Sequence, residues 1–106
     1  VLQDPEYKEA VETVFIEGHT DNSPINTPRF PSNWELSTQR AINTWQAMQA
    51  VCPELGSLTN KNNQPLFSCS GYADTRPIEP NDTEEGKSRN RRIDLRFTMV
   101  PPEKPE

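Results

Sequence analysis

The sequence contains one strong helical segment, predicted to run from about Asn33 to Val51. Ser32 and Glu35 stand three positions apart at its start, the spacing of a capping box, in which side chains satisfy backbone donors that would otherwise lack a partner. Pro53 ends the segment, because proline has no backbone N–H and disfavours helical geometry in the residue before it. Most of the stability of such a helix comes from packing, so the rest of the chain has to supply a surface for it.

Two short apolar runs of β type flank this helix, Thr13 to Gly18 before it and Leu66 to Gly71 after it, and each ends in glycine. A third strand is predicted from Arg92 to Val100, where apolar and polar residues alternate with a period of two. Its apolar residues are predicted to face the core: Ile93, Leu95, Phe97 and Met99. A short second helix is predicted from Thr83 to about Arg89.

The order strand, helix, strand, short helix, strand predicts an α/β two-layer sandwich, in which helices cover one face of a small mixed sheet. A helical crossover normally joins parallel strands, whereas the third strand could pair antiparallel. The 106 residues have room for a single domain, with a core from about residue 12 to residue 100 and flanking segments at 1–10 and 101–106. Only 31% of the residues are hydrophobic and 11 are proline, so we expect polar, proline-rich margins.

Helical spacing divides the long helix into two faces. The face predicted to pack on the core carries Trp34, Ala41, Trp45, Met48 and Cys52. A second, polar face carries Asn33, Ser37, Arg40 and Thr44. Arg40, in the middle of the polar face, can be a solvated surface residue or a binding residue.

The formal net charge is -5 at pH 7, which argues against nucleic acid as a partner, because duplex binding draws on a basic surface. The basic residues are nevertheless clustered in one segment, residues 87–96, with Lys87, Arg89, Arg91, Arg92 and Arg96. This basic segment can form a local anion site. Two cysteines, Cys52 and Cys69, allow one disulfide, with two small buried thiols as the alternative.

The segment from Gly18 to Asn22 stands where a strand ends and a loop begins, the usual place for residues exposed to a ligand. Asp21 in this segment can be a base, a metal ligand, an ion-pair partner or a turn residue. A metal site would have to use His19, the one histidine of the chain, with Glu17 and Asp21. A nucleophile triad of Ser37, His19 and Asp21 lacks an elbow motif, and nothing fixes a carboxylate pair for a glycosidase. Enzymatic activity and a cofactor are therefore not expected.

Four sequence blocks together form a specific pattern: Val14–Asp21, Ser32–Ala41, Gly71–Ile78 and Asn90–Ile93. In this order they resemble the C-terminal peptidoglycan-binding domain of the OmpA, Pal and MotB family, over about Val14 to Phe97. The family pattern Asn-x-x-Leu-Ser-x-x-Arg-Ala is met by Asn33, Leu36, Ser37, Arg40 and Ala41.

This resemblance implies noncovalent binding of a peptidoglycan stem peptide. Arg40 would pair with a carboxylate of the diaminopimelate in that peptide, and Asp21 would orient or receive its ammonium end. Thr20 and Asn33 would line the pocket, and Arg91 would supply a further cation. A zwitterionic ligand needs a fixed cation beside a fixed anion, and this set of residues provides both.

The resemblance also implies a periplasmic domain that anchors a cell-envelope protein to the wall. The loop from Ser23 to Ser32, with three prolines, is more similar to the stator-type MotB branch than to outer-membrane OmpA or Pal. A flagellar stator, or the related ZorB defence type, is therefore favoured over an OmpA-like lipoprotein. Membrane attachment would come only through an upstream segment, and the full-length protein could form a homodimer. The competing hypothesis is a protein-interaction module that uses the basic segment and does not bind the cell wall.

Overall fold

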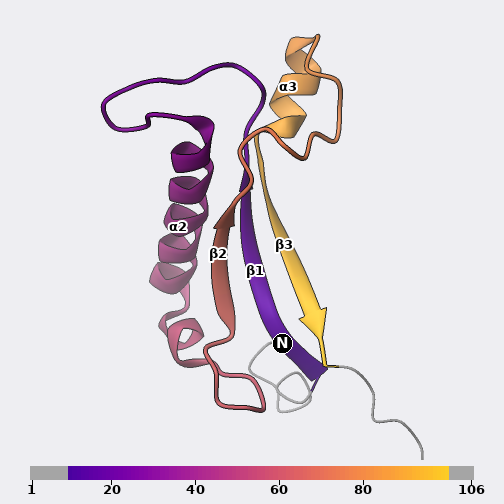
Figure 1. Cartoon of the computed structure of the whole chain (residues 1–106). Helices are drawn as coiled ribbons and strands as arrows, with labels where there is room; N and C mark the ends of the chain where they lie inside the picture. The colour runs from indigo at the N-terminus through magenta and orange to yellow at the C-terminus, as the bar shows by residue number, and fades with distance from the viewer. Residues whose placement is uncertain (1–9, 101–106) are drawn as a thin grey trace, which may run out of the picture.

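A computed structural model describes residues 10–100 of the chain. Its strands are β1 (Val11–His19), β2 (Phe67–Gly71) and β3 (Arg92–Met99), and its helices are α2 (Asn33–Val51), α3 (Glu84–Asn90) and the 3-10 helix η1 (Pro53–Ser57) (Figure 1). The bounds of the predicted long helix are confirmed, and the other predicted elements are present with ends shifted by one or two residues. The predicted flank 101–106 and nearly all of the flank 1–10 lie outside the described residues.

The sheet has β1 at its centre, in the order β2-β1-β3. β1 runs parallel to β2, with Ile16 opposite Cys69, and antiparallel to β3, with Ile16 opposite Leu95. α2 lies along one face of the sheet and packs mainly on β1 and β2, while α3 lies beyond the strand ends, next to the start of β3 (Figure 1). The predicted α/β two-layer class with a small mixed sheet is confirmed, and the third strand proves to be antiparallel.

Local hydrogen bonds explain where α2 begins and ends. The Trp34 N–H donates to Ser32 Oγ over 3.2 Å, and the Ser32 hydroxyl donates to the Glu35 carboxylate. At the other end, the Cys52 N–H donates to the Met48 carbonyl over 2.9 Å, and Pro53 starts the next element. The capping residues visible in the sequence therefore fix both limits of the helix.

Two glycines let α2 approach the sheet closely at Ser37. A Cβ at Gly18 would collide with the Ser37 carbonyl oxygen, and a Cβ at Gly71 would collide with the backbone and side chain of Thr38. Ser37 is completely buried, and its Oγ accepts a 3.0 Å hydrogen bond from the Ala73 N–H. Ser37 was grouped with the polar residues of the helix, but it does not line the predicted pocket. Its small side chain lies against the sheet and forms the contact between the two layers.

The prediction that Trp34 packs on the core is also wrong, since Trp34 is 52% exposed. The sheet ends near Ser37, so a residue one turn earlier on α2 extends past the strands. Further along the helix the predicted core face is confirmed. Ala41 is completely buried, and the Trp45 ring stacks on the Phe67 ring with their centroids 4.6 Å apart.

The apolar face of β3 is only partly covered. Leu95, Phe97 and Met99 remain 49%, 46% and 57% exposed, although their alternation predicts burial. They lie on the side of the sheet that carries α2, since Leu95 is opposite Ile16 in the register. α2 covers β1 and β2, however, and no other element of residues 10–100 covers this part of β3.

The two cysteines form no disulfide within the described structure. The Cys69 thiol donates to the Ala41 carbonyl over 3.7 Å, whereas Cys52 is at the end of α2 and its thiol donates to the Glu54 carboxylate over 3.2 Å. From Ala41 to Cys52 the helix rises by roughly 16 Å. A disulfide needs Cα atoms within about 7 Å of one another, so this geometry does not support the allowed Cys52–Cys69 bond.

Candidate functional site

Asp21 lies directly past the end of β1, where the strand passes into a loop. The Thr20 N–H donates to the Ala73 carbonyl over 2.9 Å, which ties this strand end to the segment after β2. Asp21 is 7% exposed, and its Oδ1 accepts a 2.8 Å hydrogen bond from the Ser23 N–H. The loop thus bends back on itself and fixes the direction of the carboxylate.

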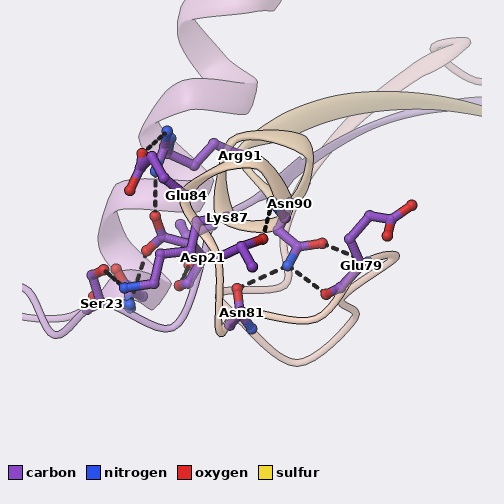
Figure 2. A network of polar contacts seen from close by, with 12 residues as sticks. Asp21, Ser23, Glu79, Asn81, Glu84, Lys87, Asn90 and Arg91 are labelled. Atoms are coloured by element: carbon purple, nitrogen blue, oxygen red, sulfur yellow. Dashed lines mark hydrogen bonds and ion pairs between the residues drawn. The ribbon is translucent and has the colours of Figure 1, made fainter.

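Arg91 reaches the same carboxylate from the junction of α3 and β3. Its Nη1 donates to Asp21 Oδ2 over 2.6 Å and its Nη2 to Glu84 Oε1 over 2.9 Å (Figure 2). Burial acts to raise the pKa of Asp21, but the hydrogen bonds from Ser23 and Arg91 outweigh it and hold this pKa below its ordinary value. The sheet register brings the two partners together. His19 pairs with Arg92, Asp21 lies two residues after His19, and Arg91 directly precedes Arg92.

Arg40 faces this ion pair from α2. A pocket of about 180 Å³ lies between them, lined by Thr20, Asp21, Ser23, Pro24, Ile25, Asn33, Leu36, Arg40 and Arg91. All five residues predicted to bind the ligand, Thr20, Asp21, Asn33, Arg40 and Arg91, are among them. The structure therefore brings the predicted site residues to one concavity.

The Arg40 guanidinium makes no hydrogen bond or ion pair with any residue between 10 and 100, although an acid lies across the pocket. Arg40 and Arg91 also line a larger groove of about 540 Å³ between α2 and α3, beside the pocket. Within the described part of the chain Asp21 is paired with Arg91, which leaves the Arg40 donors for an anion.

Asn33 and Ser23 stabilise the wall of the pocket. The Asn33 Nδ2 donates to the Ser23 carbonyl over 3.1 Å, and Lys87 Nζ donates to the Ser23 hydroxyl over 3.2 Å (Figure 2). Ser23 and Glu84 were not predicted as site residues, and no local pattern points to them, while Lys87 was predicted only as part of the basic segment. Leu36 was also missed, but its spacing from Asn33 and Arg40 places it on the same helical face and could have identified it.

Asn90 organises the segment that precedes α3. It is completely buried, and its Oδ1 accepts hydrogen bonds from the Ile78 and Glu79 N–H groups at 2.8 and 3.1 Å. Its Nδ2 donates to the Glu79 carbonyl and to Asn81 Oδ1, both over 2.8 Å (Figure 2). All four hydrogen-bonding positions of the amide are used, so Asn90 fixes the loop and holds the adjacent Arg91 in place.

The basic segment is largely neutralised by its own chain. Each of its arginines pairs with a carboxylate: Arg89 with Glu79, Arg91 with Asp21 and Glu84, Arg92 with Asp94, and Arg96 with Glu17. Lys87 donates to the Ser23 hydroxyl. These contacts give no support to the competing hypothesis of an exposed basic docking surface.

Neither the nucleophile triad nor the metal site considered from the sequence is formed among the described residues. Ser37 lies on the helix side of the sheet, and its hydroxyl donates to the Trp34 carbonyl, whereas His19 stacks on Tyr72 on the other side. His19 Nε2 lies 3.4 Å from Asp94 Oδ2, but neither ring nitrogen makes a hydrogen bond, and burial, followed by the charge of Arg92, lowers the pKa of the ring. No cluster of three metal-ligating side chains occurs among residues 10–100.

With the geometry established, comparison with known proteins shows the family. The model described as "OmpA family" matches residues 1–91. The chain belongs to the OmpA family. It is 39% identical over 82 residues to Motility protein B of Bacillus subtilis, which covers 77% of this chain and 28% of that protein. Motility protein B of Helicobacter pylori strain J99 is 35% identical over 83 residues, covering 78% of this chain and 29% of the relative. The chain thus spans less than a third of the length of these relatives.

Solved structures of similar fold include "the cell wall anchor of the T6SS from Pseudomonas aeruginosa", with a TM-score of 0.62 and 36% identity, over 79% of this chain and 52% of that one. The periplasmic domain of Helicobacter pylori MotB matches with a TM-score of 0.63 and 30% identity, over 82% of this chain and 50% of that one. These matches confirm the predicted MotB-like resemblance and agree with the predicted periplasmic location. Among the described residues, no helix is both long and apolar enough to cross a membrane.

Proposed function

We propose that this domain binds peptidoglycan noncovalently and anchors a cell-envelope protein to the wall by recognising the diaminopimelate of a stem peptide. The supporting observation is the convergence of Asp21 and Arg40 on one pocket, with Arg91 beside them. At about 180 Å³ the pocket is smaller than those that enclose whole drug-sized ligands, about 300–1,000 Å³. This size suits the terminal amino-acid group of a larger ligand.

The charges in the pocket match that group. Arg40 has no partner within residues 10–100, and a guanidinium can bind a carboxylate through two parallel hydrogen bonds. Asp21 Oδ1 accepts from the Ser23 N–H and Oδ2 accepts from Arg91, and a carboxylate has about four lone-pair sites, so it can also accept from an ammonium group. Glu84 also pairs with Arg91, so the charges around the pocket balance, and Arg40 across from Asp21 suits a group that carries both a carboxylate and an ammonium.

The relatives support a role in anchoring. Several are motility proteins, and one structural neighbour is a cell wall anchor. We therefore favour a stator-type subunit, of the flagellar or ZorB kind, as the protein that carries this domain, with an OmpA-like lipoprotein as the alternative. The domain acts by binding alone, without a cofactor, so incubated muropeptides should be recovered unchanged.

Calorimetric titration with two matched muropeptides tests the proposal. One carries diaminopimelate and the other carries lysine, which has the same side-chain amine but lacks the terminal carboxylate. We expect the wild type to prefer the diaminopimelate peptide. Arg40→Ala should weaken that binding about thirtyfold or more and abolish the preference, because loss of a desolvated ion pair costs roughly 2–5 kcal/mol.

Arg89→Ala is the matched control, because Arg89 is an exposed arginine of α3 that contacts Glu79 and does not line the pocket. Its affinity should equal that of the wild type. Equal affinity of wild type and Arg40→Ala for the diaminopimelate peptide would refute the proposal. Retention on protein-free sacculi, measured by sedimentation, provides a second readout with the intact polymer.

A further inference from the structure

A second groove lies on the opposite side of the first two turns of α2. It measures about 490 Å³ and is lined by Arg29, Phe30, Trp34, Glu35, Thr38 and Gln39. The pocket residues Asn33, Leu36 and Arg40 belong to the other side of the same helix. None of the residues that line this groove takes part in the diaminopimelate site.

The aromatic residue of this groove is unusually exposed. Trp34 remains 52% exposed although its neighbour Ser37 is completely buried. Large aromatic side chains dominate the energetics of binding surfaces, and an exposed tryptophan in a hollow marks a candidate contact. Trp34 contributes little to the core, so its side chain is available to a ligand.

The opposite wall of the groove is a hydrogen-bonded turn. The Thr27 N–H donates to the Phe30 carbonyl over 3.0 Å, and the Phe30 N–H donates to Thr27 Oγ1 over 2.9 Å. The Arg29 guanidinium lies 5.1 Å from the centre of the Phe30 ring. These contacts fix the loop that leads into α2, so the groove is formed before any ligand binds.

We infer that this groove binds a glycan strand built of N-acetylated amino sugars. A pyranose ring has an apolar C–H face and a rim of polar groups. The Trp34 indole, and the face of the Phe30 ring that Arg29 leaves open, offer flat apolar surfaces for that face. Around them, Arg29, Glu35 and Gln39 offer charged and amide groups for hydroxyl and acetamido substituents.

The groove and the pocket are positioned for two parts of one polymer, so this inference rests on the proposed function. In peptidoglycan the stem peptide is covalently attached to the glycan. The two sites lie on opposite sides of one helix, so a cross-linked wall can present a stem peptide to one and a glycan strand to the other.

Chitotetraose, a peptide-free oligomer of N-acetylglucosamine, tests the inference separately from the peptide site. Saturable binding should change the tryptophan fluorescence, because Trp34 is exposed while Trp45 is stacked on Phe67. Trp34→Ala should weaken binding, measured by calorimetry, at least about tenfold. Ile78→Ala is the matched control, since Ile78 is 59% exposed and lies outside the groove.

The two sites can be distinguished by crossing the variants with the ligands. Arg40→Ala should retain chitotetraose binding and lose the diaminopimelate peptide, while Trp34→Ala should do the reverse. Phe30→Ala provides a second variant for the sugar arm. Absence of saturable chitotetraose binding, or equal binding by wild type, Trp34→Ala and Phe30→Ala, would overturn the inference. Neither result would affect binding at Arg40, so the proposed function would stand or fall on its own experiment.

Discussion

The Asp21 carboxylate is paired with Arg91, at 2.6 Å, and not with Arg40 on the facing helix. The consequence is a division of roles between the two arginines. Arg91 fixes the acid in place from a position 70 residues later in the chain, and Arg40, without a partner among residues 10–100, is left for the proposed ligand carboxylate. A pocket in which the two opposite charges already neutralised each other would have to break that pair before it could bind.

This arrangement predicts an acid dependence of stability. The folded-state pKa of Asp21 lies below its ordinary value of 3.8, so its stabilising contribution is complete above about pH 3.8 and is lost as the pH falls further. Asp21→Asn should therefore lose less stability than the wild type between pH 5 and pH 2.5. Urea unfolding across this range measures the difference. Asp82→Asn, at an exposed position, should follow the wild type, and parallel curves for all three proteins would contradict the prediction.

The sole histidine should titrate below its ordinary pKa of 6.5, because burial disfavours its charged form and Arg92 adds to the effect. The unfolded chain then binds more protons than the folded chain, so stability falls as the pH drops below 6.5. Since the chain has one histidine, its ring proton resonances can be followed by NMR without assignment of the remaining spectrum. A midpoint at or above 6.5 would show that His19 is not buried as described.

Gly18→Ala should lower the free energy of unfolding by about 2–3 kcal/mol, since the added methyl group would collide with the Ser37 backbone. Gly56→Ala is the control. A methyl group there meets only the terminal amide of Gln49, a flexible side chain that can move aside. Urea denaturation of the two variants should separate them clearly, whereas similar midpoints would argue against the close approach of α2 to β1.

Asn90→Ala should destabilise the loop before α3 by about 2–3 kcal/mol, because four hydrogen-bonding groups lose a buried partner. Hydrogen exchange should show faster exchange of the Ile78 and Glu79 amides. The exposed Ser88→Ala, on the same helix, should leave these amides protected. Affinity for the diaminopimelate peptide should also fall when the loop is destabilised, because Arg91, which lines the pocket, directly follows Asn90.

The elements that could be predicted are those determined by neighbouring residues. Ser32 and Pro53 specify the limits of α2 through local hydrogen bonds and local sterics, and the mixed sheet follows from the order of the elements. The burial of Ser37 and the exposure of Trp34 depend instead on where the strands end and on two glycines from other parts of the chain. Helical spacing alone does not contain that information.

The candidate site shows the same division. The resemblance to a family identified Asp21 and Arg40, and both line the pocket. It did not identify the Arg91 contacts with Asp21 and Glu84, nor the network centred on Asn90, because these join segments that are distant in sequence. Similarly, the alternation in β3 predicts a strand correctly but does not reveal how far one helix extends across the sheet.

The position of Arg91 at the junction of α3 and β3 makes the pocket depend on the pairing of the last strand. The pocket is complete only when β3 has paired with β1, since that pairing brings the guanidinium to the acid at the far end of the central strand. A chain that has formed only β1, α2 and β2 lacks one wall of the pocket and leaves its carboxylate without a counterion. Binding of the proposed ligand should therefore require the complete sheet, although Asp21 and Arg40 both lie outside β3.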